Sequence, residues 1–543
     1  MSSDGLPKRL KIPQLSELPA DQVTPAVLVL LEICHRQQEQ IQQLRDEIAR
    51  LKGEKPKPKI KPSVLEGARR DKPKGKRPKQ RCKRCKTREL MIHETRCIPP
   101  EELPEGSRFK GYEDFTVQDL RIELHNTRFR LERWESPTGE RLVGKLPAEL
   151  SARHYGPTLR SYILHQYHHA HVTQPLLLEQ LLEWGVAISA GQLSAMITRG
   201  HEGFHAEKEA LLRVGLEHSG YVHVDDTGAR HRGHNGYCTH IGNERFAYFA
   251  STASKSRINF LELLRAERGD YVLNEEALAY MKARKLPRDP LALLASHARR
   301  TFNGQDAWRG ALTGLGITEP RHVRTATEGA LLGSVLAQGL NRELVIVSDD
   351  AGQFDVLRHA LCWVHAERLF VKLVGFNEAQ REALAAVRGE IWQLYAELKA
   401  YKTAPDAAHK ARIDGRFDAL CATKTCFASL DRALRRMHRN KAELLLALVR
   451  PDIPLHNNLS ERDIRDYVKK RKISGSTRSD EGRRCRDTFA SLKKTCRKHG
   501  VSFWQYLNDR VCGVARIPPL AELIPPRAPP DTGAAPLALS AIA

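Results

Sequence analysis

Two short strand-like segments, far apart in the chain, limit the folds that this sequence can adopt. Residues 220–224 alternate in the manner of a half-buried strand and run into Asp225. Residues 344–348 are a compact apolar strand that runs into Asp349. Because open α/β sheets place their chemistry at the C-terminal ends of strands, we expect Asp225 and Asp349 to converge in space.

The segments around these strands predict the rest of a mixed α/β core. Residues 238–241 and 245–251 have the pattern of two further strands, and a helix is expected near 256–265. Residues 266–340 predict mainly helices and loops, and 377–448 a long helical stretch. The predicted order begins with consecutive strands and continues with a strand that alternates with helices. This order indicates an α/β fold with a mixed sheet.

The charge of the chain indicates a polyanionic partner. Its 543 residues include 88 Lys or Arg and 65 Asp or Glu, a formal net charge of +23. Residues 52–88 hold 17 Lys or Arg and 3 acids, and residues 461–499 hold 14 and 6, so these two blocks carry +14 and +8. A single block can be a solvated tail, but two favour contact with nucleic-acid phosphates. An anionic membrane surface is the alternative.

The N-terminal part predicts a leader, a coiled coil and a linker. Residues 1–25 are expected to be a flexible leader. Residues 26–53 carry a heptad whose β-branched a positions and Leu d positions favour a parallel dimer, although a short helix packed on its own domain is an alternative. The a positions are Val27, Cys34, Ile41 and Ile48, and the d positions are Leu30, Gln37, Leu44 and Leu51. Residues 54–81, rich in Lys and Pro, predict an extended basic linker.

A cysteine pair opens the next segment, residues 82–150. Cys82 and Cys85 form a C-x2-C pair, which can present two thiolates to one tetrahedral zinc ion, and His93 or Cys97 could complete the site. We therefore expect a small zinc- and DNA-binding element here. No second pair of this spacing follows, so reduced thiols in a basic loop are the alternative.

Residues 151–215 predict a helical region that binds DNA. A helix over 174–184 stops at Gly185, and Ser189 suits the N-cap of a second helix that runs to Ile197. Such a pair could be a helix-turn-helix, although many core helix pairs share the pattern.

The two ends of the chain carry few further signals. Residues 511–543, rich in Pro and Ala, are expected to be a disordered tail. No apolar run approaches the roughly 18–20 residues of a membrane-spanning helix, and the first residues lack the apolar block of a signal peptide. We therefore expect a soluble intracellular protein.

A third acid, Glu461, stands at the start of a basic helix in the segment Asn457-Asn458-Leu-Ser460-Glu461. Ser460 could cap that helix, and a carboxylate in its first turn is favoured by the helix dipole. Three converging carboxylates repel one another unless a cation lies between them, and such oxygen ligands suit Mg²⁺ or Mn²⁺. An Asp at a strand end is also a common turn residue, so the pattern alone leaves both interpretations open.

Four segments carry a resemblance to a known family. They are Val224-Asp225-Asp226-Thr227, Ser348-Asp349-Asp350 with Cys362-Trp363-Val364-His365, Ile391-Trp392-Gln393-Leu394-Tyr395, and Asn457-Asn458-Leu459-Ser460-Glu461-Arg462 with Arg465 and Arg471-Lys472. Together they resemble the bacterial insertion-sequence transposases of family sixty-six, which have a DDE-type core. The resemblance covers nearly the whole chain, most securely 155–260 and 340–490, and its last block is the most specific.

This chain departs from the family pattern at several positions. His456 stands where the family usually has Asp, and Asp226 where it has Glu. Asp349 and Asp350 are both candidates for the second acid, and the strand phase favours Asp349. The first two acids are far apart, which is consistent with an insertion within 270–340.

The resemblance implies an RNase H-like catalytic domain over 216–510, with a helical insert at 376–450. Asp225 would lie on the first strand, Asp349 after the fourth, and Glu461 on a later helix. These acids would hold two Mg²⁺ or Mn²⁺ ions. The implied enzyme cuts DNA at transposon ends and joins the freed 3′-OH to target DNA. A non-catalytic DNA-binding or accessory protein, a degraded inactive copy, and a nuclease without strand transfer are the alternatives.

The resemblance also suggests roles for neighbouring side chains and partners. Phosphates would contact the basic side chains of the last block, Arg462, Arg465, Lys469, Lys470, Arg471 and Lys472. Cys362 and His365 are expected to support the second acid rather than bind metal. The partners implied are transposon-end and target DNA, a second copy joined through the N-terminal helix, and accessory transposition proteins, in the bacterial cytoplasm at the nucleoid. A membrane partner is disfavoured, because the second basic block surrounds Glu461.

Overall fold

The structure is a computed structural model of the chain, and it describes Val27, Leu30, Ile33, Cys34, Gln37 and residues 92–100, 102, 107–146, 154–266, 268–337 and 340–526. The chain forms two compact units, one of residues 1–66 with 129–543 and the other of residues 67–128. The described part of the second unit contains neither helix nor strand. The folded elements discussed below all belong to the first unit.

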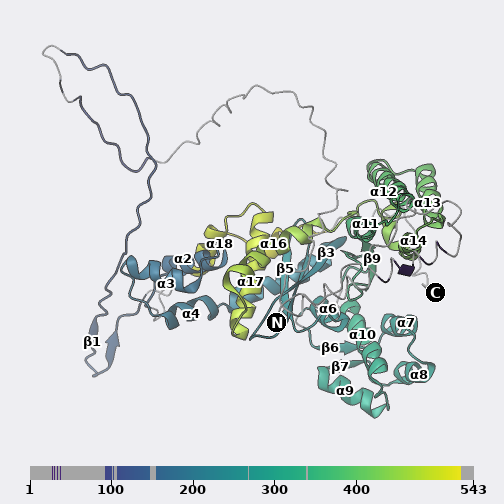
Figure 1. The fold of residues 1–543 in the computed structure, drawn as a ribbon. Helices are drawn as coiled ribbons and strands as arrows, with labels where there is room; N and C mark the ends of the chain where they lie inside the picture. Colours follow the sequence, from purple (N-terminus) through teal and green to yellow (C-terminus); the bar gives the residue numbers. More distant parts are fainter. Residues whose placement is uncertain are drawn as a thin grey trace, which may run out of the picture. The chain divides into compact units, whose positions relative to one another are not determined.

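A five-stranded mixed sheet forms the centre of the first unit (Figure 1). Its strands, in spatial order, are β5 (Ala247–Thr252), β4 (Tyr237–Gly242), β3 (Tyr221–Gly228), β8 (Val345–Ser348) and β9 (Arg358–Leu361). The first three pair antiparallel, whereas β3, β8 and β9 run parallel. The predicted mixed α/β sheet is therefore confirmed, and β9 is a strand that the sequence did not predict.

One edge of this sheet is closed by a helix rather than by another strand. The long helix α17 (Asp480–Lys498) lies along β5 and presents Asp487, Ser491 and Thr495 to it, one helical turn apart. The oxygens of these side chains accept hydrogen bonds from the outward-facing backbone N–H groups of Ser251, Phe249 and Ala247, with N to O distances of 2.7, 2.8 and 3.1 Å. An edge strand with satisfied donors cannot recruit a strand from another chain.

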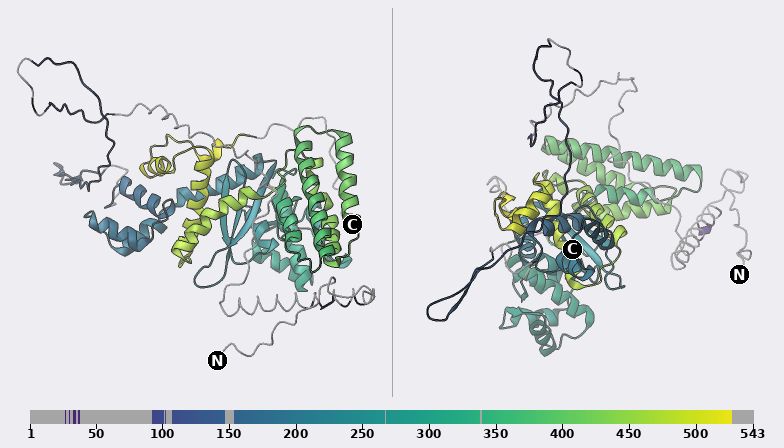
Figure 2. Two further views of the ribbon diagram at one scale, coloured as in Figure 1. Left: turned by 45° about the horizontal axis from the view of Figure 1, so that its top comes forward. Right: turned by 90° about the vertical axis from the view of Figure 1, so that its left-hand side faces the viewer.

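The predicted helical stretch after β9 is confirmed. It follows α11 (Trp363–Val371) and contains α12 (Glu378–Thr403), α13 (Ala407–Ala422), α14 (Ala428–Arg439), α15 (Lys441–Leu444) and a 3₁₀ turn at Leu446–Leu448. The helices α12, α13 and α14, green in Figure 2, lie side by side. They enclose their own apolar core around Leu394, Phe417 and Leu434. We call this helical region, residues 378–448, the helical insert.

The segment between β5 and β8 is larger than a simple connection. It contains α6 (Arg257–Leu264), β6 (Asp270–Val272), α7 (Glu275–Ala283), α8 (Arg288–Ser296), β7 (Thr301–Asn303), α9 (Gln305–Gly314) and α10 (Pro320–Ala337). The helices were predicted, whereas the small β6–β7 sheet was not. This segment shares an apolar core with the central sheet.

The helical region before the sheet follows its sequence signals closely. It consists of α2 (Pro157–His168), α3 (Gln174–Glu183) and α4 (Ala190–Thr198), and it leads into α5 (Glu202–His218). Gly185 ends the α3 turn with φ 81°, and Ser189 caps α4 in a reciprocal capping box with Gln192. Both helices are confirmed, and the reading of DNA by this pair stays a prediction. A short β1–β2 hairpin (Arg133–Glu135, Arg141–Val143) lies upstream.

The C-terminal part corrects one prediction. After α18 (Phe503–Cys512) the chain forms a 3₁₀ turn at Leu520–Leu523, and Leu520 and Ile524 are buried in the main core. The prediction of a disordered tail from residue 511 is therefore wrong up to residue 526, because these apolar side chains pack into the main core. Residues 527–543 lie outside the described part.

The predicted coiled coil is described at few positions. Val27, Leu30, Cys34 and Gln37 are helical, and the other heptad positions lie outside the described residues, so the parallel dimer stays a prediction. Among the described residues, no helix is long and apolar enough to cross a membrane.

Two lysines of the sheet-covering helices lie against the C-terminal end of α2. Lys470 of α16 (Asn458–Ser474) donates to the Tyr167 carbonyl at 2.8 Å, and Lys493 of α17 donates to the His168 carbonyl at 3.3 Å. Free carbonyls at a helix C-terminus attract cations, so these contacts join the helical region to the sheet domain. Burial, and then the charges of Arg486 and Lys493, lower the pKa of Lys470 to about 7.

Replacing Lys470 by Met should change the pH dependence of stability. An unfolded lysine titrates near pKa 10.4, so between about pH 7 and 10 the folded state binds fewer protons and the free energy of unfolding rises with pH. The Lys470→Met variant lacks this contribution. We expect the Tm difference, wild type minus variant, to increase by several degrees from pH 7 to pH 10 in thermal unfolding. The exposed neighbour Lys469→Met is the control, and an equal trend in both variants would contradict the account.

Candidate active site

The register of the parallel strands puts two acids at the same edge of the sheet. In the β3–β8 ladder, His223 pairs with Val347. Asp225 lies two residues beyond His223, and Asp349 lies two residues beyond Val347, directly after the end of β8. The two acids therefore occupy equivalent positions on neighbouring strands.

The third acid reaches this edge through buried polar contacts at the start of α16. Asn457 is fully buried, and its amide Nδ2 donates to the carbonyl of Val224 at 2.7 Å while its Oδ1 lies 3.0 Å from Nδ1 of His223. Glu461 follows in the first turn of the helix. Val224, which precedes Asp225, is therefore bonded to Asn457, and the helix of Glu461 starts directly after Asn457.

Ser460 differs from its expected role. The helix begins directly after Asn457, so Ser460 lies inside the first turn rather than at the cap. Its hydroxyl is 2.6 Å from Nδ1 of the buried His240 on β4. Ser460 therefore adds a second buried bond between α16 and the sheet.

The three acids share one electrostatic environment. Burial raises the pKa of Asp225 to about 7, and the negative charges of Asp349 and Glu461 add to that rise. Carboxylates that repel one another favour a bound cation, and their oxygens are the ligands that divalent cations such as Mg²⁺ prefer. Their oxygens are not all within 4.8 Å of one another, unlike those of a separate group described below.

Glu461 has two cationic or polar neighbours on α11. Nη1 of Arg368 lies 3.4 Å and Nε2 of His365 lies 3.6 Å from Oε1 of Glu461. Arg368 also lies 3.0 Å from His365. His365 thus contacts the third acid, whereas the sequence suggested support of the second. Cys362 accepts the backbone N–H of Asn457 at 3.1 Å, so it too supports the start of α16.

The two adjacent acids, Asp226 and Asp350, have partners of their own. Asp226 accepts bonds from the Thr239 hydroxyl at 2.5 Å and from the Gln353 amide at 3.0 Å. Asp350 forms an ion pair with Arg436 of α14, with Nε to Oδ2 at 3.0 Å.

The basic side chains of α16 divide into two groups. Arg462, Arg465, Lys469 and Lys472 are exposed. Lys470 departs from the predicted phosphate contact, because it is buried with its ammonium over the ring of Tyr167 at 3.5 Å. Arg471 is half-buried and donates to the Thr227 hydroxyl and the Gly228 carbonyl, just beyond Asp225 on β3.

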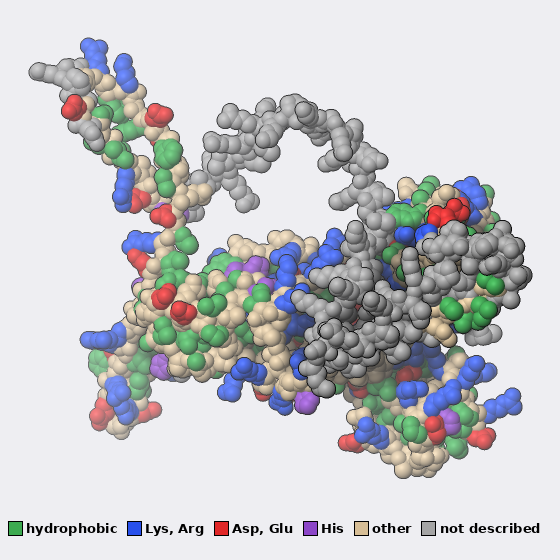
Figure 3. Space-filling view, in the orientation of Figure 1, with side chains coloured by type: hydrophobic (Ala, Val, Ile, Leu, Met, Phe, Trp, Pro, Cys, Tyr) green, Lys and Arg blue, Asp and Glu red, His purple; other side chains and the backbone are tan. Residues whose placement is uncertain are grey.

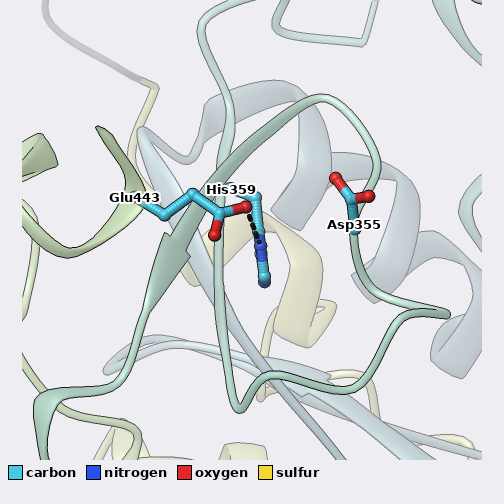
Figure 4. A group of neighbouring side chains, drawn as sticks. All are labelled: Asp355, His359 and Glu443. Carbon is cyan, nitrogen blue, oxygen red and sulfur yellow. Dashed lines mark hydrogen bonds and ion pairs between the residues drawn. The ribbon is translucent and has the colours of Figure 1, made fainter. Parts of the chain in front are cut away.

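A second group of potential ligands, Asp355, His359 and Glu443, lies at β9, the loop before it and α15 (Figure 4). His359 contacts Glu443 through Nδ1 at 3.0 Å and the Ser348 hydroxyl through Nε2 at 2.7 Å. Asp355 accepts a bond from Arg284 at 2.6 Å. His359 and Glu443 bond each other and Asp355 pairs with Arg284, so each carboxylate has a partner without a metal ion.

The predicted zinc ligands are described only in part. His93 and Cys97 are exposed, and Cys82 and Cys85 lie outside the described residues. Zinc binding stays a prediction.

Sequence reasoning missed several side chains that hold the site together. They are His223, His240, Arg368 and Arg436. The spacing of Arg368, one helical turn after His365, is a signal that could have indicated a shared target, because residues three apart lie on one helix face. The contacts of the two histidines and of Arg436 cross 80 residues or more of sequence and carry no local signal.

Comparison with known proteins identifies relatives of this chain. The family model described as "Transposase IS66 family" matches residues 337–484, which contain Asp349, the helical insert and Glu461. The uncharacterized protein y4jO of Sinorhizobium fredii (strain NBRC 101917 / NGR234) is 46% identical over 321 residues, which are 59% of this chain and 100% of that protein. The uncharacterized protein y4qI of the same strain is 27% identical over 188 residues, 32% of this chain and 34% of that protein. The chain belongs to the IS66 family of transposases.

Proposed function

We propose that this transposase cleaves DNA at transposon ends and transfers the freed 3′-OH into target DNA, in a metal-dependent reaction. The observation that carries the proposal is the equivalent position of Asp225 and Asp349 on the parallel strands β3 and β8, with Glu461 bonded to the same edge through Asn457. We further propose that the domain is RNase H-like. Its order of three antiparallel strands followed by two parallel ones supports this assignment.

The proposed metal ligands are Asp225, Asp349 and Glu461. When bound there, Mg²⁺ or Mn²⁺ would activate a nucleophilic oxygen and stabilise the charge that develops on the phosphate. Asp349 is favoured over Asp350 because Asp350 pairs with Arg436, whereas the charge of Asp349 acts on both Asp225 and His365.

The chain's own residues would orient these ligands. The bonds from Thr239 and Gln353 to Asp226 fix the end of β3 directly beside Asp225. Arg368 and His365 hold the carboxylate of Glu461, and the positive charge of Arg368 compensates the negative charge of that carboxylate. Such supporting contacts keep ligand side chains in one orientation, which metal sites generally require.

The proposed DNA surface near the site is the exposed side of α16, with Arg462, Arg465, Lys469 and Lys472. Arg465, Lys469 and Lys472 are four and three residues apart and lie on one face of the helix. Figure 3 shows Lys and Arg side chains scattered over the visible face of the described residues. Phosphate contacts of this kind position DNA without reading its sequence.

Substitution of any one of the three acids should abolish catalysis without abolishing DNA binding. We expect Asp225→Asn, Asp349→Asn and Glu461→Gln each to lower the rate of Mg²⁺-dependent cleavage of transposon-end DNA by roughly 10³-fold or more. Asp355→Asn is the matched control, since it alters the other carboxylate group, and it should keep most of the activity. Full activity in any of the three variants would refute the assignment. If the wild type does not cleave DNA and all the variants bind DNA as the wild type does, the protein is instead an accessory DNA-binding protein.

Neutralising the exposed cations of α16 should weaken DNA binding in a salt-dependent way. Each of Arg465→Gln and Lys469→Gln is expected to reduce the slope of log affinity against log salt by about 1, the value for one lost phosphate contact. The buried Lys470→Met should leave the slope unchanged. If fluorescence anisotropy titrations give all three variants the same slope of log affinity against log salt, α16 is not part of the DNA-binding surface.

A further inference from the structure

Helix α14 of the helical insert has one strongly basic face. Its exposed arginines are Arg432, Arg435, Arg436 and Arg439. Their spacing of three, four and seven residues confines them to an arc of roughly 100° around the helix. Leu430, Leu434 and Met437, on the opposite side, are buried in the core of the insert. We call the four side chains the α14 arginine face.

A charged helix face is often only a solvated surface, but this one lacks the acids that usually accompany it. Elsewhere on the insert, Arg388 pairs with Glu367, and Arg416 pairs with Glu390 and Glu397. Within the part of the chain that the structure describes, Arg432, Arg435 and Arg439 have no carboxylate partner. Like charges three and four residues apart on a helix destabilise it slightly, so an anion from outside would stabilise this arrangement.

The α14 arginine face adjoins the candidate active site. Arg436 pairs with Asp350, the residue after Asp349. Arg436 also lines a hollow together with Asp350 and His365, and His365 contacts Glu461. The face therefore meets the loop after β8 at Arg436, and Arg432 and Arg439 lie on either side of that point along α14. Arg432 and Arg439 are seven positions apart, a rise of about 10 Å along the helix, which matches about three base pairs of DNA at 3.4 Å each.

We propose that the α14 arginine face binds the backbone phosphates of the DNA that flanks the phosphodiester to be cut. The inference rests on the proposed function, because DNA is the polyanion that such a site would act on. Guanidinium groups suit this role, since they form paired hydrogen bonds with phosphate oxygens and stay charged at all relevant pH values. Arg436, held by Asp350, would fix the part of the face that lies nearest to the acids.

The test is the salt dependence of DNA binding by the full-length triple variant Arg432→Gln/Arg435→Gln/Arg439→Gln. The probe is a fluorescent duplex that carries the terminal inverted repeat, in EDTA so that no cleavage occurs. We expect the slope of log affinity against log salt to fall by about 2 to 3, and the affinity at 0.15 M salt to fall at least tenfold. The control variant Arg381→Gln/Lys410→Gln/Arg412→Gln removes the same charge from exposed positions on α12 and α13. Its slope should fall by less than 1.

The outcomes separate this inference from the proposed function. A triple-variant slope equal to that of the wild type, or an equal fall in the control, would overturn the inference even if the wild type cleaves DNA. A selective fall in slope would support it even if the wild type proves inactive. Should the glutamine variant misfold, the variant Arg432→Lys/Arg435→Lys/Arg439→Lys keeps the charge and should keep most of the wild-type slope. A slope that falls by about 2 to 3 in this lysine variant would contradict the proposal.

Discussion

The site depends on one buried amide. Asn457 bonds the backbone of β3 next to Asp225, the ring of His223 and the thiol of Cys362 at the start of α11. These groups come from three segments that are about a hundred residues or more apart in sequence. A buried amide that loses its partners costs about 1–3 kcal/mol, so alternative positions of α16 are disfavoured. The same contact that fixes the helix also fixes where Glu461 lies relative to the strand acids.

The rest of the domain supplies rigidity on either side of that contact. On one side, side chains of α17 accept hydrogen bonds from the free edge of β5. On the other, the helical insert packs on its own apolar cluster and returns the chain to the sheet edge at Asn457. Its only ion pair described with the loop after β8 is that of Arg436 with Asp350. The insert therefore contacts the loop that begins with Asp349, beside the strand that carries Asp225.

Much of this arrangement could be predicted from local patterns, and the remainder could not. Strands β3 and β8, the cap at Ser189 and the helical insert follow from alternation, apolar runs and helical spacing. Strand β9 was missed because Arg358–Leu361 lacks the apolar run that marks β8 and owes its extended form to pairing with β8. Lys470 was misassigned because helical periodicity does not reveal that the carbonyls at the end of α2 cover it. The acids themselves were predicted from strand ends and a family resemblance, whereas the side chains that hold them required the tertiary structure.

The central claim is that Asp225, Asp349 and Glu461 together form a divalent-metal site. Anomalous diffraction from crystals of the protein soaked with Mn²⁺ tests it most directly, because Mn²⁺ positions are observed without any assumption about activity. The account predicts manganese within bonding distance of carboxylate oxygens of Asp225, Asp349 and Glu461. Manganese at Asp355, His359 and Glu443, with none at the three acids, would contradict it.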